Sequence, residues 1–158
     1  MKTTNLTNLE ISKKLKEIGF EADTLFYWTK VVKFKKTDPD IDCITIICEN
    51  EKWRLYKTDV PAYDLETLID ALPDSITREY KSNKDGTIRE FEENLVIEKN
   101  KIWYNCYDIE TSDEANEYWR EYEYQQDISI YHYYDSLANL AGKMLIKLFE
   151  AGLINFNK

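Results

Sequence analysis

Glycine is scarce in this sequence of 158 residues. Only Gly19, Gly86, Gly142 and Gly152 occur, and each stands at least ten positions from the next. Phosphate-binding loops, dinucleotide-binding fingerprints and the Gly-x-Ser-x-Gly nucleophile elbow all need closely spaced glycines, because the backbone must approach a phosphate or adopt a strained turn. The sequence therefore excludes these nucleotide-binding and hydrolase classes.

Metal-binding residue types are also few. The three cysteines, Cys43, Cys48 and Cys106, form no Cys-x-x-Cys pair, and His132 is the single histidine. We therefore predict no zinc site and no cofactor. The odd number of thiols and the polar start of the chain favour a reducing compartment, so we expect an intracellular, cytoplasmic protein. No apolar run approaches the roughly 20 residues that span a bilayer, so we expect no membrane partner.

Positive charge is in short supply and unevenly placed. The chain has 21 basic and 30 acidic residues, a formal net charge of −9. Residues 1–36 carry +4 and residues 37–158 carry −13. Affinity for a phosphate backbone comes from many lysines and arginines, so a nucleic-acid partner is not expected. Residues 1–36 contain a basic stripe that consists of Lys13, Lys14, Lys16, Lys30, Lys33, Lys35 and Lys36. We interpret this stripe as a solvated helix face and strand edge.

Residues 108–135 are the acidic extreme, with nine acids against the single Arg120. The same stretch holds six of the twelve tyrosines, together with Trp119. Tyrosine and tryptophan are favoured in binding hot spots, while an array of carboxylates can select a basic partner or imitate a phosphate backbone. The alternative is a solvated surface whose apolar side belongs to the core.

Hydrophobic periodicity and turn residues predict the order of the elements. They are a helix at 8–18; strands at 25–34, 41–48 and 52–57; a short helix capped by Asp64 and ended by Pro73; strands at 76–81, 87–99 and 101–108; a helix at 112–122; a strand at 127–134; and a helix capped by Asp135 or Ser136 and closed by Gly152. The even positions from 118 to 134 also alternate as in a strand, so the secondary structure of 112–134 stays open. We predict one α+β domain over 1–158, with an antiparallel sheet packed against the N-terminal, middle and C-terminal helices.

Two details of this prediction concern the helix ends and the core. Thr7 and Glu10 have the spacing of a capping box for the first helix. Leu140, Leu145 and Leu148 lie at the centre of the widest apolar face, so they should be buried. The strands from 76 onward are expected to continue the sheet that the earlier strands begin.

Two segments carry a resemblance. Pro61-Ala62-Tyr63-Asp64-Leu65, continuing to Leu72-Pro73, and Ser136-Leu137-Ala138-Asn139-Leu140-Ala141, continuing to Gly152-Leu153-Ile154, resemble small uncharacterised phage and prophage proteins. Those proteins pair a helix ending in Leu-Pro with a C-terminal Leu-Ala-x-x-Leu-Ala helix. The resemblance implies a mobile element in a bacterial cell and an accessory or host-directed role; it assigns no functional residue.

Short acidic patterns offer an enzymatic alternative. Asp40, Glu79 and Lys81 match the arrangement in which two carboxylates hold Mg²⁺ and a lysine orients the attacking water of a nuclease. Asp38, Asp40, Asp42 and Glu49 imitate a calcium loop, but Cys43 replaces the glycine of its sharp turn. We interpret this stretch as a polar turn leading into a strand.

The favoured hypothesis is a non-catalytic module that binds a protein with a basic surface. His132 would need a nucleophile within hydrogen-bond reach to act as a base, so a structural role is favoured. No catalytic or metal-binding residue is predicted, and the oligomeric state stays open. The predicted partner-binding residues are Glu117, Trp119, Glu121, Tyr122, Glu123, Tyr124, Asp127, Tyr131 and Tyr133. The alternative is a metal-dependent, nuclease-like hydrolase built on Asp40, Glu79 and Lys81.

Overall fold

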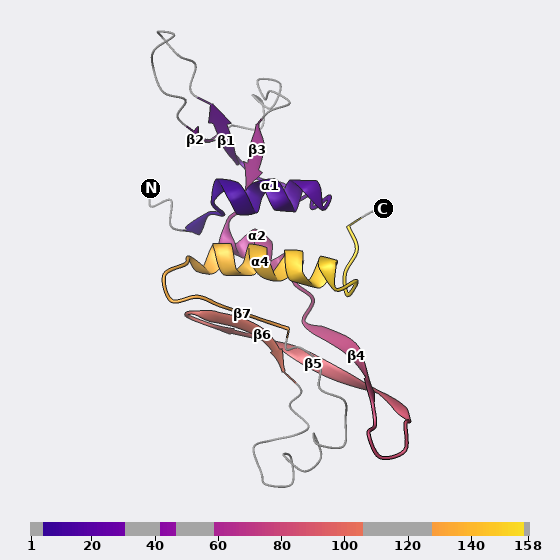
Figure 1. Ribbon diagram of the computed structural model, residues 1–158. Coiled ribbons are helices and arrows are strands. Elements are labelled where there is room, and N and C mark those ends of the chain that lie inside the picture. Colours follow the sequence, from indigo (N-terminus) through magenta and orange to yellow (C-terminus); the bar gives the residue numbers. More distant parts are fainter. Residues whose placement is uncertain (1–4, 31–41, 47–58, 106–127, 157–158) are drawn as a thin grey trace.

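A computed structural model of the protein describes residues 5–30, 42–46, 59–105 and 128–156 (Figure 1). Its helices are α1 (Leu9–Glu17), α2 (Leu65–Ala71) and α4 (Leu137–Glu150). Its strands are β1 (Phe26–Lys30), β2 (Asp42–Ile46), β3 (Val60–Ala62), β4 (Ser75–Lys81), β5 (Ile88–Glu98), β6 (Lys101–Asn105) and β7 (Ser129–Tyr131). The predicted α+β class, with antiparallel strands and N-terminal, middle and C-terminal helices, is confirmed.

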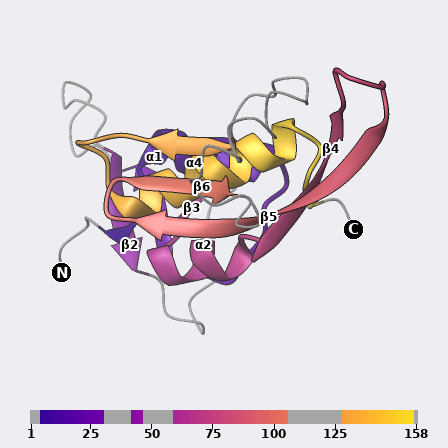
Figure 2. The same cartoon turned by 90° about the horizontal axis from the view of Figure 1, so that it is seen from below.

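The strands form two separate antiparallel sheets, ordered β2-β1-β3 and β4-β5-β6-β7. The helices lie between them: α1 packs on β3, α1 and α2 both pack on α4, and α4 packs on β6 and β7 (Figures 1 and 2). The prediction that the later strands continue the first sheet is therefore wrong. Because α2 follows β3 directly and packs against α4, β4 begins on the other side of the helical layer.

The first sheet also differs from the predicted meander. β1 is its central strand, and the segment that pairs with its second edge is the short β3, with Phe26 opposite Ala62. The strand predicted at 52–57 and the helix predicted at 112–122 lie outside the described residues. The predicted 127–134 strand is shorter in the structure, where only Ser129–Tyr131 pairs with β6.

The N-terminus of α1 is capped by Asn8, whose Oδ1 accepts a 2.9 Å hydrogen bond from the Ile11 amide. The predicted cap, Thr7, is one residue too early. Its hydroxyl is fully buried, is hydrogen-bonded to the Ser12 hydroxyl at 2.8 Å, and accepts the Tyr63 amide at 3.0 Å. Thr7 therefore fixes the start of α1 to the residues that follow β3.

The core surrounds α4, as its wide apolar face predicts. Ser136 caps the helix by accepting the Asn139 amide at 3.2 Å, and Leu140, Leu145 and Leu148 are all fully buried. The prediction of these three core residues is confirmed. No helix among the described residues is both long enough and apolar enough to cross a membrane.

Candidate binding surface

An exposed pair of tyrosines stands at the outer edge of the second sheet. Along β7 and its approach, Ile128 and Ile130 turn toward the core, so the alternation of a strand turns Tyr131 outward. Tyr131 is 49% exposed and Tyr133 68% exposed, and their rings meet edge to face at 4.7 Å between centroids. Both residues were predicted to bind a partner, and the structure brings them together on the surface.

β6 adds a third aromatic side chain and a cation beside this pair. In the antiparallel register, Lys101 lies opposite Tyr131, and Trp103 lies opposite Ser129. The Lys101 ammonium rests over the Trp103 ring at 4.2 Å from its centroid. Lys101, Trp103, Tyr131 and Tyr133 are here called the aromatic face.

Lys101 and Trp103 were not predicted from the sequence, because they precede the acidic stretch and are far from Tyr131 along the chain. Only the pairing of β6 with β7 places them beside Tyr131. Tyr134 was also missed, although it is 95% exposed. Its position directly before the predicted cap of the last helix could have signalled exposure, since a helix N-terminus is commonly solvated.

The hydroxyl of Tyr131 is neutral at physiological pH. The hydrogen bond between the Tyr131 and Tyr133 side chains raises the pKa of Tyr131 to about 12. Proton loss from Tyr131 therefore supplies no negative charge near pH 7. The attraction of this pair for a cation therefore comes from the faces of its rings.

His132 lies between the two tyrosines with its side chain exposed to solvent. Its Nδ1 accepts a 3.3 Å hydrogen bond from the Tyr134 amide, and its ring meets the Tyr134 ring at 6.3 Å. This contact holds the backbone that connects β7 to α4.

Seven of the predicted partner-binding residues lie outside the described ranges, so their positions stay predictions. They are Glu117, Trp119, Glu121, Tyr122, Glu123, Tyr124 and Asp127.

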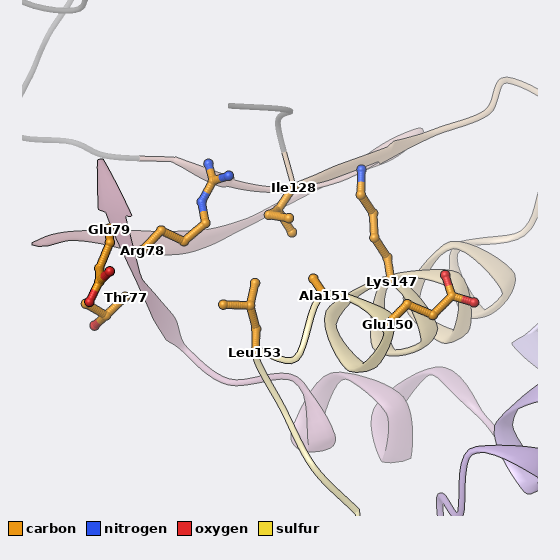
Figure 3. A pocket seen from close by; sticks show the side chains of 8 residues that line it. All are labelled: Thr77, Arg78, Glu79, Ile128, Lys147, Glu150, Ala151 and Leu153. Carbon is orange, nitrogen blue, oxygen red and sulfur yellow. The ribbon is translucent and has the colours of Figure 1, made fainter. Parts of the chain in front are cut away.

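A hollow of about 640 Å³ opens between β4, the start of β7 and the C-terminal end of α4 (Figure 3). It is lined by Thr77, Arg78, Glu79, Ile128, Lys147, Glu150, Ala151 and Leu153. Two of these side chains are cations and two are carboxylates, so their formal charges cancel. The Lys147 ammonium also donates a 3.2 Å hydrogen bond to the Ser129 carbonyl. The charge of the lining therefore favours neither an anion nor a cation.

Arg78 is held in this wall by a buried carboxylate. Glu93 is only 2% exposed, and its Oε1 accepts 2.6 Å hydrogen bonds from the Arg78 Nε and from the Tyr80 hydroxyl. The Arg78 guanidinium also lies over the Tyr80 ring, 5.2 Å from its centroid. A buried charge pair of this kind is costly to break, because either partner left alone would be an uncompensated charge. The network stabilises the β4–β5 ribbon.

The nuclease-like pattern is only partly described. Glu79 and Lys81 both have exposed side chains on β4, where Glu79 lies directly opposite Glu90. Asp40 lies outside the described residues, so this alternative remains an untested prediction. Within the ranges that the structure describes, no three His, Cys, Asp or Glu side chains are grouped so that they could hold a metal ion. Of the calcium-like loop, Asp42 begins β2, while its other three acids also lie outside those ranges.

Comparisons with known proteins give no match: no family model, curated protein or solved structure is similar to this chain.

Proposed function

We propose that this chain is a non-catalytic module that binds a protein with a basic surface, through an acidic and tyrosine-rich surface. The observation that carries the proposal is the exposed contact pair of Tyr131 and Tyr133 at the edge of the second sheet. Large aromatic rings gathered on a protein surface are typical of binding sites, because they bury a large area at a low cost in side-chain entropy.

The charge of the chain supports a basic partner. Residues 108–135, which include the two tyrosines, carry nine acids and one arginine. Carboxylates at the rim of an interface speed association with a cationic surface, while buried rings slow dissociation. The two kinds of residue should therefore control different rate constants.

The resemblance to phage and prophage proteins at 61–73 and 136–154 supports a setting for this role. It favours an accessory protein that acts in the cytoplasm of a bacterial host on a host protein. The basic partner would then belong to the host, which makes a host lysate the appropriate source from which to isolate it.

The experiment is a capture from bacterial lysate followed by kinetics with the purified partner. Glu121→Gln with Glu123→Gln should slow association and flatten its salt dependence, since exposed charges act at long range. Tyr131→Ala with Tyr133→Ala should chiefly speed dissociation. Tyr122→Ala and Tyr124→Ala should do the same if the surface includes them.

Matched controls come from exposed residues elsewhere. Glu66→Gln with Glu90→Gln removes the same charge from α2 and β5. Ile88→Ala truncates a side chain that is 62% exposed at the far end of β5 from the aromatic face. If the controls change binding as much as the test variants, or if all the variants leave both rate constants unchanged, the proposal is wrong.

A further inference from the structure

We propose that the aromatic face accepts a lysine or arginine side chain of the partner, which takes the place over Trp103 that the ammonium of Lys101 occupies. This inference rests on the proposed function and assigns its contact chemistry. Lys101 lies 4.2 Å from the centre of the Trp103 ring, so the chain itself shows that this ring holds a cation. In the complex, the cation of the partner would displace the Lys101 ammonium from the face of the Trp103 ring.

The position of the ring makes it reachable. Ile102 and its opposite residue Ile130 face the core, so the alternation of β6 turns Lys101 and Trp103 to the opposite face of the sheet. Both side chains are partly exposed. On that face Lys101 lies opposite Tyr131, which places the exposed tyrosine pair beside the ring that would receive the cation.

The energetics allow exchange. A cation over an indole ring at an exposed site contributes little interaction free energy, so its displacement costs little. The Lys101 side chain can also move away from the ring, because four rotatable bonds connect its ammonium to the backbone. A guanidinium is planar and more weakly hydrated than an ammonium, so an arginine of the partner stacks on the ring at a lower cost of desolvation. The partner side chain that stacks on Trp103 is therefore expected to be arginine more often than lysine.

The surrounding charge favours a cationic occupant over a nucleic acid. Glu98 pairs with Lys101 in the register of β5 and β6, and the whole chain carries −9. A phosphate backbone laid across this part of the sheet would meet the Glu98 carboxylate beside Lys101, whereas its affinity requires several neutralising cations. Single-stranded nucleic acid is the competing occupant that the test must separate.

The test measures binding of a labelled octa-arginine peptide to the full chain by fluorescence anisotropy, at physiological ionic strength. Lys101→Met removes the ammonium that lies over the ring and keeps most of the side-chain stem. Lys84→Met removes the same charge from the exposed turn between β4 and β5 and serves as the control. Lys101→Met should tighten binding about two- to fivefold beyond the effect of Lys84→Met, the range that an exposed cation–π contact supplies.

The ring is tested by a double-mutant cycle. In the Trp103→Leu background, Lys101→Met should tighten binding no more than Lys84→Met does, because no ring remains for the cation of the peptide. Trp103→Phe retains an aromatic face and should keep part of the gain, which also covers the case in which Trp103→Leu fails to fold. Thermal melting of each variant checks that the fold is retained.

The outcomes separate the two proposals. If octa-arginine binds the wild-type chain but Lys101→Met and Lys84→Met have equal effects, the inference is wrong and the proposed function stands. If octa-arginine does not bind at all, the basic partner itself is refuted, and the inference with it. Tighter binding of an oligothymidine than of octa-arginine would assign the aromatic face to nucleic acid and overturn the inference.

Discussion

Replacing Gly142 with alanine should destabilise the protein, although alanine is the better helix former. Gly142 lies in α4 where this helix crosses α1. A β-carbon added there would stand 2.6 Å from Ile11 Cγ2, 3.3 Å from Thr7 Cγ2 and 3.4 Å from Leu15 Cδ1. All three neighbours are buried, and the branched side chain of Ile11 has little rotamer freedom in a helix. The two helices must therefore move apart.

The magnitude follows from two opposing effects. Alanine gains about 1 kcal/mol of helix propensity over glycine in a helix interior. Overpacking a close-packed core costs about 1–3 kcal/mol, and a contact of 2.6 Å places this substitution toward the upper part of that range. We therefore expect Gly142→Ala to lower the free energy of unfolding by about 1–2 kcal/mol, measured by urea denaturation with an unchanged m value.

A second background tests the cause. Ile11→Ala removes the methyl group that lies nearest the added β-carbon, at its own cost of about 2–5 kcal/mol. In that background Gly142→Ala should become neutral or stabilise the protein by up to about 1 kcal/mol, because the gain in helix propensity is then offset by a smaller steric cost. If Gly142→Ala stabilises the wild-type chain, or if its effect is the same in both backgrounds, the close contact between α1 and α4 is refuted.

Four further outcomes are expected. Leu145→Ala should lower the free energy of unfolding by about 2–5 kcal/mol, and a loss below about 1 kcal/mol in denaturant would contradict the central place of α4 in the core. Glu93→Ala should cost about 3–5 kcal/mol in the same assay, because it leaves the Arg78 charge without its buried partner; a neutral effect would refute that role. Burial raises the pKa of Asp135, but hydrogen bonds from Lys143 and Asn139 outweigh it and hold the pKa below its ordinary value of 3.8. The ionised carboxylate therefore contributes to the free energy of unfolding above about pH 4, and this contribution is lost as the pH falls through the lowered pKa of the folded state. Asp135→Asn should weaken the acid dependence of the free energy of unfolding, and an unchanged pH profile would count against this. Addition of a chelator should leave the thermal midpoint unchanged, and a rise on adding Ca²⁺ or Mg²⁺ would revive the acidic metal patterns.

Local patterns predicted the helices well. The apolar face of α4 and its buried leucines follow from spacing along one segment, which also narrowed the cap to Asp135 or Ser136. The cap of α1 was misassigned because Thr7 and Asn8 are both good capping residues. The hydroxyl of Thr7 instead accepts a hydrogen bond from the amide of Tyr63, which is far away in the sequence, and this leaves Asn8 as the cap.

Long-range pairing set the limit of the sequence analysis. Strand composition predicted antiparallel strands, but it does not indicate which strands share a sheet. One sheet was therefore predicted where the structure has two. The same limit applies to the candidate surface. Tyr131 and Tyr133 were identified from composition, whereas Trp103 and Lys101 join them through the β6–β7 register alone.

The central claim is that the tyrosine pair on β7 and the segment after it bind a basic protein. The most direct measurement is the dissociation rate of the partner captured from host lysate, for wild type and for Tyr131→Ala with Tyr133→Ala, at two salt concentrations. The account predicts faster dissociation of the double variant at both concentrations, because lost ring burial is insensitive to salt, with the Ile88→Ala control matching wild type. Identical dissociation rates for wild type and the double variant would contradict it.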